Sequence, residues 1–545
     1  MGNKRNKKRK AVRTPPSKIK KMAKRGRYCD ENPGPSGMKI GTNTEKIRQC
    51  PPPMKNVNEE NGYSHYIILE CLSDECEWKY CFNTSKKQGH SHEINVRAVL
   101  AFREIGRGHS AMLTFNKVMN MPAPLSRQNF TNIQNKKLLP VVKQLANDSM
   151  LSCAMKMKEG LDNENGECGI SLDGTWQKRG HTSHNGVVTA ISLDTKKCLD
   201  IEVLSDKCQQ CLKWQKKEHD VRYNEWKASH ICKINHKGSS NSMETCGAIR
   251  IFERSMATRG LRYKNMLGDG DSSTYSAIVE REPYGKDCIP KKLECIGHVQ
   301  KRVGSRLRRL KSSHKGVKLG DGKGVSGKGR LTDAKIDLLQ NYYGLAVREN
   351  LHDIDKMAKA IKASLYHVAS SDDNPQHELC PDTEDSWCGY KKDPTTYHHK
   401  NGIPKSIVEL IEPIYESLSD KSLLQKCTHG LTQNVNECLN GLIWERCPKS
   451  TYVEQETVAL SSYLAVLKFN EGDILFLKLF SDLDILPGLF TTNGALHCDT
   501  DRIKLSSKKS TEKVKKRRKT LRHMRKNFVD SSEQNEGKTY EAGAF

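Results

Sequence analysis

Residues 168–176 are Cys-Gly-Ile-Ser-Leu-Asp-Gly-Thr-Trp, a short apolar segment that runs into an Asp-Gly pair. Short apolar segments bounded by turn residues are typical of β-strands, so we predict a strand at 169–176. Apolar residues at helical spacing predict a helix at 242–258. The strand pattern recurs four more times, at 186–193, 197–204, 263–268 and 293–296.

The order of these segments indicates a fold class. Three strands, a helix, a fourth strand, and then a fifth strand followed by a helix is the order of a ribonuclease H-like fold. We therefore predict an α/β protein with a ribonuclease H-like catalytic core, in which helices flank a mixed sheet. Two segments interrupt this core: a cysteine-rich one at 205–241, interpreted as a zinc-binding insert, and one at 312–425, interpreted as helices and loops.

Composition divides the remainder of the chain. Residues 1–60 are rich in Lys, Pro, Gly and Asn and lack hydrophobic periodicity, which predicts a disordered basic tail. A Cys-containing module with helices at 61–160 precedes the core, which we place at 165–450. A helical extension at 451–503 and a basic, mobile tail at 504–545 follow it.

The net charge of +27 is concentrated in three blocks, at 1–27, 298–323 and 504–526. Basic blocks attract nucleic-acid phosphates by releasing counterions. For the two tails we expect nuclear import and nonspecific DNA contact. The middle block lies inside the folded region, where the alternative to DNA binding is a solvated basic face. Its candidate DNA-binding residues are Lys301, Arg302, Arg306, Arg308 and Arg309.

No run of about 18 uncharged apolar residues is present, and the basic N-terminus lacks the apolar core of a secretory signal. We therefore expect no membrane association. The 20 cysteines then belong in a reducing compartment, where cysteines clustered with histidines indicate zinc sites rather than disulfides.

The strongest zinc pattern is Cys208-x2-Cys211-x20-Cys232-x3-His236, with His230 as a competing fourth ligand. Two short-spaced pairs supply the four S and N ligands of tetrahedral Zn²⁺. The alternative is a set of unmetallated surface thiols.

Two weaker zinc patterns are present. His377, Cys380 and Cys388 resemble half of a second site, completed by Cys427 or His429, against the alternative of buried or loop cysteines. A looser set in the N-terminal module, with no obvious fourth ligand, consists of Cys71, Cys76 and Cys81.

Three acidic residues are candidates for a catalytic metal site. Asp173 is near the end of the first predicted strand, Asp269 is at the end of the fourth, and Glu437 is on a predicted helix at 433–445. Carboxylates that converge from two strand ends and a helix suit hard divalent cations, which clamp the attacking and leaving oxygens of a phosphoryl transfer. Any single Asp-Gly pair also suits a turn, so spacing alone does not select this triad from 64 acids.

The sequence resembles Mutator-like transposases, in particular a group abundant in arthropod genomes. The resemblance extends over roughly residues 63 to 545 and includes the terminal Tyr-Glu-Ala-Gly-Ala-Phe. The other segments that carry it are Ile-Ser-Leu-Asp-Gly-Thr-Trp-Gln-Lys-Arg-Gly (170–180), Gly-Ser-Ser-Asn-Ser-Met-Glu (238–244), Leu-Gly-Asp-Gly-Asp-Ser (267–272), Leu-Glu-Cys-Ile-Gly-His-Val-Gln-Lys-Arg (293–302) and Gly-Lys-Gly-Arg-Leu-Thr-Asp (327–333).

The resemblance implies a DDE transposase whose metal-binding acids are Asp173, Asp269 and Glu437, with Asp271 as a rival for the second position. It also implies a supporting role near the active site for Cys295 and His298 in Cys-Ile-Gly-His.

The function expected from the resemblance is cut-and-paste DNA transposition. Two Mg²⁺ (or Mn²⁺) ions would serve cleavage and strand transfer, and Zn²⁺ would be structural. The expected partner is double-stranded DNA, both transposon terminal repeats and target DNA, bound by a homo-oligomer in the nucleus. The alternative is a domesticated or decayed derivative that contains zinc and binds DNA without cutting it.

Overall fold

The computed structural model of the chain describes residues 55–70, 79–160, 166–178, 182–270, 272–382, 386–399, 402–518, 520–521 and 524. Asn58–Tyr66 and the residues from Asn83 onward belong to one compact unit, which holds the sites considered below. Among the described helices, none is long and apolar enough to cross a membrane.

The described chain begins with a three-stranded sheet of β1 (Lys55–Asn61), β2 (Ser64–Glu70) and β3 (Lys79–Asn83). Strand β1 starts inside the segment that we predicted to be disordered, and the rest of that segment lies outside the described residues. Cys81 is exposed on β3, but Cys71 and Cys76 also lie outside the described residues, so the looser cysteine set stays a prediction.

A mixed five-stranded sheet forms the centre of the large unit. Its strand order is β10-β9-β6-β7-β8, in which β6, β7 and β8 are antiparallel while β9 and β10 run parallel to β6. The predicted α/β class with a mixed sheet is therefore confirmed. The strands are β6 (Glu167–Trp176), β7 (Asn185–Ser192), β8 (Cys198–Ser205), β9 (Arg262–Gly268) and β10 (Lys291–Glu294).

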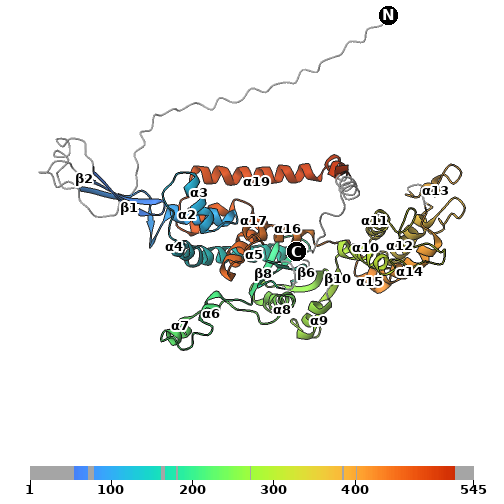
Figure 1. Cartoon of the computed structure of the whole chain (residues 1–545), viewed down its shortest axis with the longest axis horizontal. Helices are drawn as coiled ribbons and strands as arrows, with labels where there is room; N and C mark the ends of the chain where they lie inside the picture. The colour runs from blue at the N-terminus through green and yellow to red at the C-terminus, as the bar shows by residue number, and fades with distance from the viewer. Residues whose placement is uncertain are drawn as a thin grey trace, which may run out of the picture. The chain divides into compact units, whose positions relative to one another are not determined.

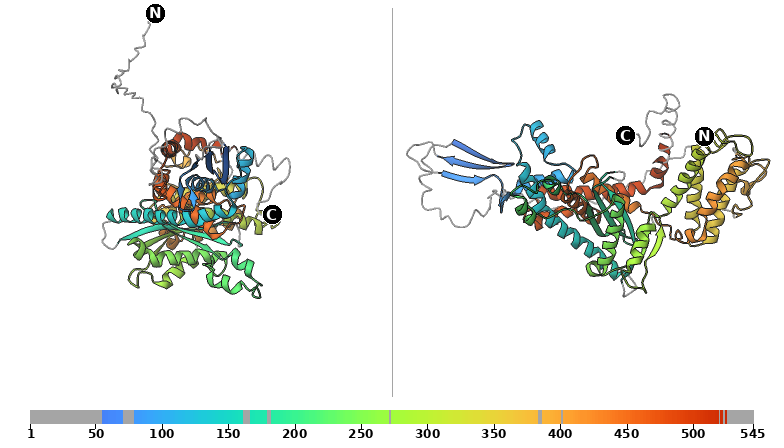
Figure 2. Two further views of the ribbon diagram at one scale, coloured as in Figure 1. Left: turned by 90° about the vertical axis from the view of Figure 1, so that its left-hand side faces the viewer. Right: turned by 60° about the horizontal axis from the view of Figure 1, so that its bottom comes forward.

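Helices cover both faces of this sheet, as Figures 1 and 2 show. Successive strand residues point to opposite faces, so Val187 and Val188 on β7 belong to different cores. Val188 packs with Met243 and Phe252 of α8 (Ser240–Arg259), whose neighbour is α9 (Ser272–Arg281). Val187 packs in a larger core built from α5 (Leu139–Glu159), α16 (Asn434–Arg446) and α17 (Gln455–Glu471).

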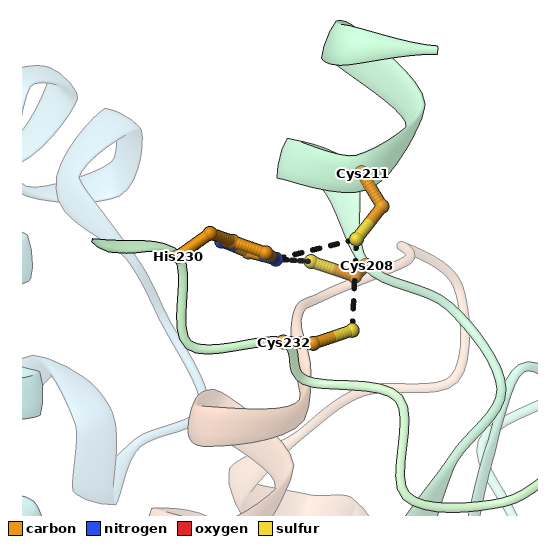
Figure 3. Close-up of side chains that lie close together, drawn as sticks. All are labelled: Cys208, Cys211, His230 and Cys232. Carbon is orange, nitrogen blue, oxygen red and sulfur yellow. Dashed lines mark hydrogen bonds between the residues drawn. The ribbon is translucent and has the colours of Figure 1, made fainter. Parts of the chain in front are cut away.

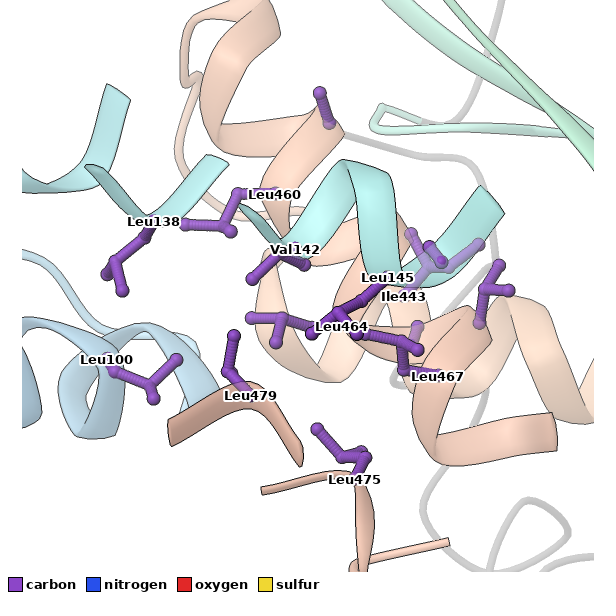
Figure 4. Packing of buried hydrophobic residues seen from close by; sticks show 14 of the residues in the cluster. Leu100, Leu138, Val142, Leu145, Ile443, Leu460, Leu464, Leu467, Leu475 and Leu479 are labelled. Carbon is purple, nitrogen blue, oxygen red and sulfur yellow. The ribbon is translucent and has the colours of Figure 1, made fainter. Parts of the chain in front are cut away.

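Helix α17 is the main difference from the predicted organisation. We predicted residues 451–503 to be a C-terminal extension, but α17 is buried on almost all sides, including Thr457 and Ser461, and lies between α5 and α16 (Figure 4). The apolar run at 458–467 covers the whole circumference of the helix, as expected of a central helix. Helix α18 (Leu475–Asp482) and α19 (Leu489–Ser510) follow, and α19 continues past the predicted start of the mobile tail at 504.

A second group of helices lies between β10 and α16 in sequence and has its own apolar core, which includes Val303, Leu339, Ile361 and Ile411. Gly304 lies where its first two helices pack, and a Cβ there would lie 1.9 Å from Gln340 Oε1, so that flexible side chain would have to move. These helices are α10 (Ile296–Ser313), α11 (Asp333–Glu349), α12 (Ile354–Ala369), α13 (Gly389–Lys392), α14 (Lys405–Leu418) and α15 (Lys421–Gln425).

The remaining elements are short or peripheral. Between β8 and α8 the chain forms α6 (Gln209–Trp214) and α7 (Tyr223–Ser229), within the predicted zinc-binding insert. Before the central sheet it forms β4 (Lys87–Gln88), β5 (Ser91–His92), α2 (Glu93–Glu104), α3 (His109–Val118), α4 (Arg127–Asn132) and the π-helix η1 (Ile133–Leu138).

Candidate active site and metal-binding clusters

Two of the predicted acids lie near the ends of adjacent parallel strands. Ser171 of β6 is in register with Leu267 of β9. Asp173, two residues further along β6, and Asp269, the residue directly after β9, therefore lie toward the same end of these two parallel strands. Asp173 pairs with Thr189 of β7 and therefore points to the face of the sheet that α16 covers.

Helix α16 is fixed along β6 by polar side chains from one side of the helix. Each of four residues at 433, 436, 440 and 444 donates a hydrogen bond to β6, at the spacing of successive helical turns. The bonds run from Gln433 Nε2 to the Leu172 carbonyl (2.8 Å), Asn436 Nδ2 to the Ser171 carbonyl (3.2 Å), Asn440 Nδ2 to Asp173 Oδ2 (2.6 Å) and Trp444 Nε1 to Thr175 Oγ1 (2.8 Å).

Glu437 lies within this run of anchoring residues, one position after Asn436 and one turn before Asn440, and its side chain is exposed. The pKa of Asp173 is raised to about 7, chiefly by burial; the hydrogen bond from Asn440 opposes the shift, and the negative charges of Asp269 and Glu437 add to it. The pKa of Asp173 therefore responds to the charges of the other two acids, and a metal site formed by all three stays a prediction. Sequence reasoning missed Asn440, although the polar residues at 433, 436 and 440 mark one stripe of the helix.

Cys295 joins three elements beside these acids. It is buried, its backbone N–H donates to the Gly268 carbonyl at the end of β9, and its Sγ accepts from the backbone N–H of Gln433. His298 follows in the first turn of α10. Burial and the charge of Lys301 lower the pKa of His298, while Asp269 and Glu437 oppose this shift, which indicates that the imidazole lies near both carboxylates. Asp271, the predicted rival of Asp269, lies outside the described residues.

Arg302 holds the turn that carries Asp269. Its guanidinium pairs with the buried Glu294 at 2.7 Å and donates to the backbone carbonyl of Asp269 at 3.2 Å. Gly270 has φ +100°, and a Cβ there would lie 1.5 Å from an Arg302 nitrogen, so the turn requires glycine at this position.

The predicted DNA-binding residues of α10 differ in their contacts. Arg308 pairs with Asp337, and Arg306 donates to Ser417 Oγ at 2.9 Å. Lys301 and Arg309 are exposed and form no ion pair with any residue that the structure describes. The predicted basic face therefore contains residues with structural partners and residues whose charge is directed to solvent.

Three of the four predicted zinc ligands of the insert come together. Cys208, Cys211 and Cys232 lie with His230, and the four ligand atoms are within 4.8 Å of one another (Figure 3). His230 Nε2 is 3.6 Å from Cys208 Sγ and 3.2 Å from Cys211 Sγ, and the Sγ atoms of Cys211 and Cys232 are 3.5 Å apart. A tetrahedron with metal–ligand bonds of about 2.0–2.3 Å has edges of roughly 3.3–3.8 Å, which these distances approach.

The structure does not bring the predicted fourth ligand, His236, to this group, and the competing His230 lies there instead. His236 is buried at the start of α8, where its Nε2 lies 3.1 Å from Ser242 Oγ and 3.2 Å from the Ser239 carbonyl. Its backbone N–H donates to the Ser205 carbonyl, which holds it against the sheet. Position 230 instead follows α7 directly and faces the cysteines.

A second group brings together His367, His377, Cys380 and Cys388. Three of these four residues were predicted, but His367 of α12 was not. The suggested completing residues lie elsewhere. Cys427 is buried in the apolar core of the helical group, and the ring of His429 bonds the backbone at Lys426 and Leu431.

Comparison with known protein families supplies the remaining observation. A family model described as Mutator-like transposase matches residues 36–388, which is well over half of the chain. The match includes Asp173, Asp269 and both Cys/His groups, while Glu437 lies beyond it. No curated protein matches the sequence. The length of the family match shows that this chain belongs to the Mutator-like transposases.

Proposed function

We propose that this chain cleaves DNA at transposon ends and transfers the freed strand to target DNA. Its family membership supports a transposase-related function that acts on DNA. The observation that carries the finer proposal is that Asp173 on β6 and Asp269 directly after β9 lie toward the same end of two adjacent parallel strands, while α16, which carries Glu437, is anchored to β6. The strand order, three antiparallel strands followed by two parallel ones with a helix between, supports a ribonuclease H-like core.

The donor set fits hard divalent cations. Carboxylate oxygens are the ligands that Mg²⁺ and Mn²⁺ prefer, and three mutually repelling carboxylates are stabilised by a divalent charge. Asn440 adds a further oxygen, because its Oδ1 is buried without a hydrogen-bond partner among the described residues. Two such ions, when bound, would activate the attacking hydroxyl and stabilise the leaving oxygen of the phosphodiester.

The surrounding residues position these ligands. Asn440 engages Asp173 Oδ2 and so fixes the orientation of that carboxylate. Arg302 sets the backbone of Asp269 through its carbonyl, and Cys295 ties the same turn to the start of α16. Preorganised ligands of this kind are needed because phosphoryl transfer depends on positioning and electrostatic stabilisation.

The DNA partner in this proposal is double-stranded, both terminal repeats and target DNA. Lys301 and Arg309 would contact its phosphates, since these two cations of α10 are exposed. We propose a homo-oligomer that acts in the nucleus, because transposition must bring two element ends together.

We also propose that Cys208, Cys211, His230 and Cys232 bind a structural zinc ion. Besides the tetrahedral spacing, backbone N–H groups of Cys211, Lys233 and Gln210 donate to Cys208 Sγ, an arrangement that stabilises a metal-bound thiolate. Substituting His230→Ala would lower the zinc content of the purified chain by about one equivalent, whereas His236→Ala would leave it unchanged. The reverse result would make His236 the fourth ligand.

The test of the catalytic proposal is strand cleavage of DNA that carries the element's own terminal repeats, in the presence of Mg²⁺ or Mn²⁺. Asp173→Asn, Asp269→Asn and Glu437→Gln should each abolish cleavage while DNA affinity is retained, because these changes remove metal ligands and keep side-chain size. If the wild-type chain binds the repeats but never cuts them, it is a non-cleaving, zinc-containing DNA-binding derivative. Cleavage that survives in all three variants would place the active site elsewhere.

A further inference from the structure

The second Cys/His group lies at the end of one helix and in the loop that follows it. His367 is in the last turn of α12, while His377, Cys380 and Cys388 are in the long connection between α12 and α14. His377, Cys380 and Cys388 are at most 3% exposed. Burial of three polar or ionisable side chains at one point in a loop calls for a compensating interaction.

The distances within this group match those of a tetrahedral metal site. His367 Nδ1 is 3.8 Å from Cys380 Sγ and 3.7 Å from Cys388 Sγ, and His377 Nδ1 is 3.7 Å and 3.4 Å from the same sulfurs. The two Nδ1 atoms are 3.2 Å apart. Bonds of about 2.0–2.3 Å to zinc at the centre of a tetrahedron give edges of roughly 3.3–3.8 Å, the range that these five distances approach.

The hydrogen bonds behind His377 are those that a metal-bound histidine uses. Its Nε2 is 2.7 Å from Nε2 of His399, and Nδ1 of His399 is 2.6 Å from Asp372 Oδ1. If His377 Nδ1 carries no proton, its Nε2–H donates to His399, whose Nδ1–H in turn donates to Asp372. Every polar atom in this series of hydrogen bonds is then satisfied, and a lone pair points to the sulfurs.

Aromatic rings enclose the group. Tyr390 stacks on His377 at 4.4 Å and 15°, and Trp387 contacts the edge of His367 at 4.9 Å. Tyr397 packs at 5.0 Å against His399. Rings that fix imidazole orientation and exclude water make a preformed ligand set, in contrast to exposed thiols that meet by chance.

We propose a second structural zinc site, with His367, His377, Cys380 and Cys388 as its ligands. His399 and Asp372 act as positioning residues that hold His377 in the ligating tautomer. The ion would fasten the connection between α12 and α14 to the end of α12, where the loop has few apolar side chains of its own. The proposal does not rest on the cleavage activity, and its tests measure zinc.

Zinc content per chain tests the site directly, in a full-length background in which Cys211→Ser and Cys232→Ser disable the first cluster. This background should retain about one equivalent of zinc, and adding Cys380→Ser with Cys388→Ser should remove it. X-ray absorption at the zinc edge of the background protein should show two sulfur and two nitrogen neighbours. A folded background without zinc, or an edge spectrum without this mixed S/N set, would overturn the proposal.

Substitutions at His367 separate ligation from packing. His367→Ala should lose the remaining zinc, whereas His367→Cys should keep it, because a thiolate can replace an imidazole as ligand. If His367 only packs against Trp387, neither variant would change the zinc content, and that result contradicts the proposal.

The neighbouring histidines provide a matched pair for the positioning role. The side chain of His399 is 6% exposed and bonds His377, whereas that of His398 is 86% exposed. His399→Ala should weaken zinc affinity roughly 10–100-fold in a chelator competition, the usual cost of removing such a partner, and His398→Ala should leave it unchanged. Equal affinities for both variants would remove His399 from the site.

Discussion

The acidic residues of the candidate active site and the basic residues of α10 are neighbours, but the protein holds them differently. Asp173 accepts a hydrogen bond from a helix that is itself anchored to β6 at four positions. On α10, only Arg302 is tied to the same region, while Lys301 and Arg309 extend into solvent. The anchored acids have a fixed geometry, which phosphoryl transfer requires. The exposed cations provide positive charge, which can attract the DNA backbone without a fixed geometry.

This difference indicates what a substitution should change in each region. Loss of an anchoring residue should alter stability or cleavage and leave DNA affinity nearly constant. Loss of an exposed cation should alter affinity and its salt dependence and leave stability constant. The contacts of Arg302 make it an anchoring residue, although it lies on the same face of the helix as the exposed Arg309.

The largest effect on stability is expected at Asn436, which is fully buried and bonds both the side chain and the carbonyl of Ser171. Asn436→Ala leaves these buried groups unpaired and should lower the free energy of unfolding by about 2–3 kcal/mol. Chemical denaturation measures this change. Asn434→Ala, at an exposed position of the same helix, should change it by less than about 0.5 kcal/mol. Similar values for the two variants would show that α16 is not anchored through this stripe.

Substitution of Asn440 tests whether the anchoring of α16 also contributes to the rate of strand cleavage. Asn440→Ala removes the donor to Asp173, a hydrogen bond to a charged group that contributes about 1.5–3 kcal/mol. The rate of strand cleavage should fall roughly 10–100-fold, while DNA affinity stays the same. Single-turnover cleavage with saturating protein measures the rate apart from binding. A variant that cleaves at the wild-type rate would show that the orientation of Asp173 does not depend on α16.

The anchored region was also the more predictable one. Asp-Gly pairs follow the Ile-Ser-Leu segment at 170–172 and the Met-Leu-Gly segment at 266–268, so the approximate positions of the two acids relative to these strands could be predicted from the sequence. The mixed α/β class followed from the order of the same strands. The buried helix α17 was misplaced because an apolar run on all sides shows no amphipathic pattern, which was the signal used to find the other helices.

The Cys/His groups show why ligand sets predicted from spacing were incomplete. Closely spaced cysteines were correctly grouped, since a short loop keeps them near each other. The histidines were not, because His236 is drawn to the start of α8 by its own hydrogen bonds, and His367 comes from a helix that precedes the other ligands. The side of a helix or loop that faces a cluster depends on packing between distant segments, which local spacing does not encode.

Alanine variants of Arg302 and Arg309 compare an anchored and an exposed cation on the same face of α10. Arg302→Ala removes the closer of the two cations that the described structure pairs with the buried Glu294 and leaves Lys292 at 3.5 Å, so the free energy of unfolding should fall by about 1–2 kcal/mol. Because Arg302 is engaged by the protein, the salt dependence of DNA binding should stay at the wild-type value. Arg309→Ala should give the opposite pattern. If Arg302→Ala changes the salt dependence and not the stability, its ion pair with Glu294 does not persist in the complex with DNA.

The smallest effect is expected from the exposed cations, and it is the most specific for phosphate binding. Lys301→Ala combined with Arg309→Ala removes two charges from α10 without breaking an ion pair of the described structure. DNA affinity should fall for all sequences alike, and the slope of log affinity against log salt should shrink by about one for each phosphate that the helix no longer neutralises. Unfolding free energy and zinc content should not change, because neither side chain supports the cores or the Cys/His groups.

Titrations at several salt concentrations, with unrelated duplexes as well as terminal repeats, distinguish this outcome from impaired base recognition, which would weaken binding to one sequence only. An unchanged slope would show that α10 does not bind the DNA backbone through these residues, and the exposed end of the basic helix would then lie away from the bound duplex.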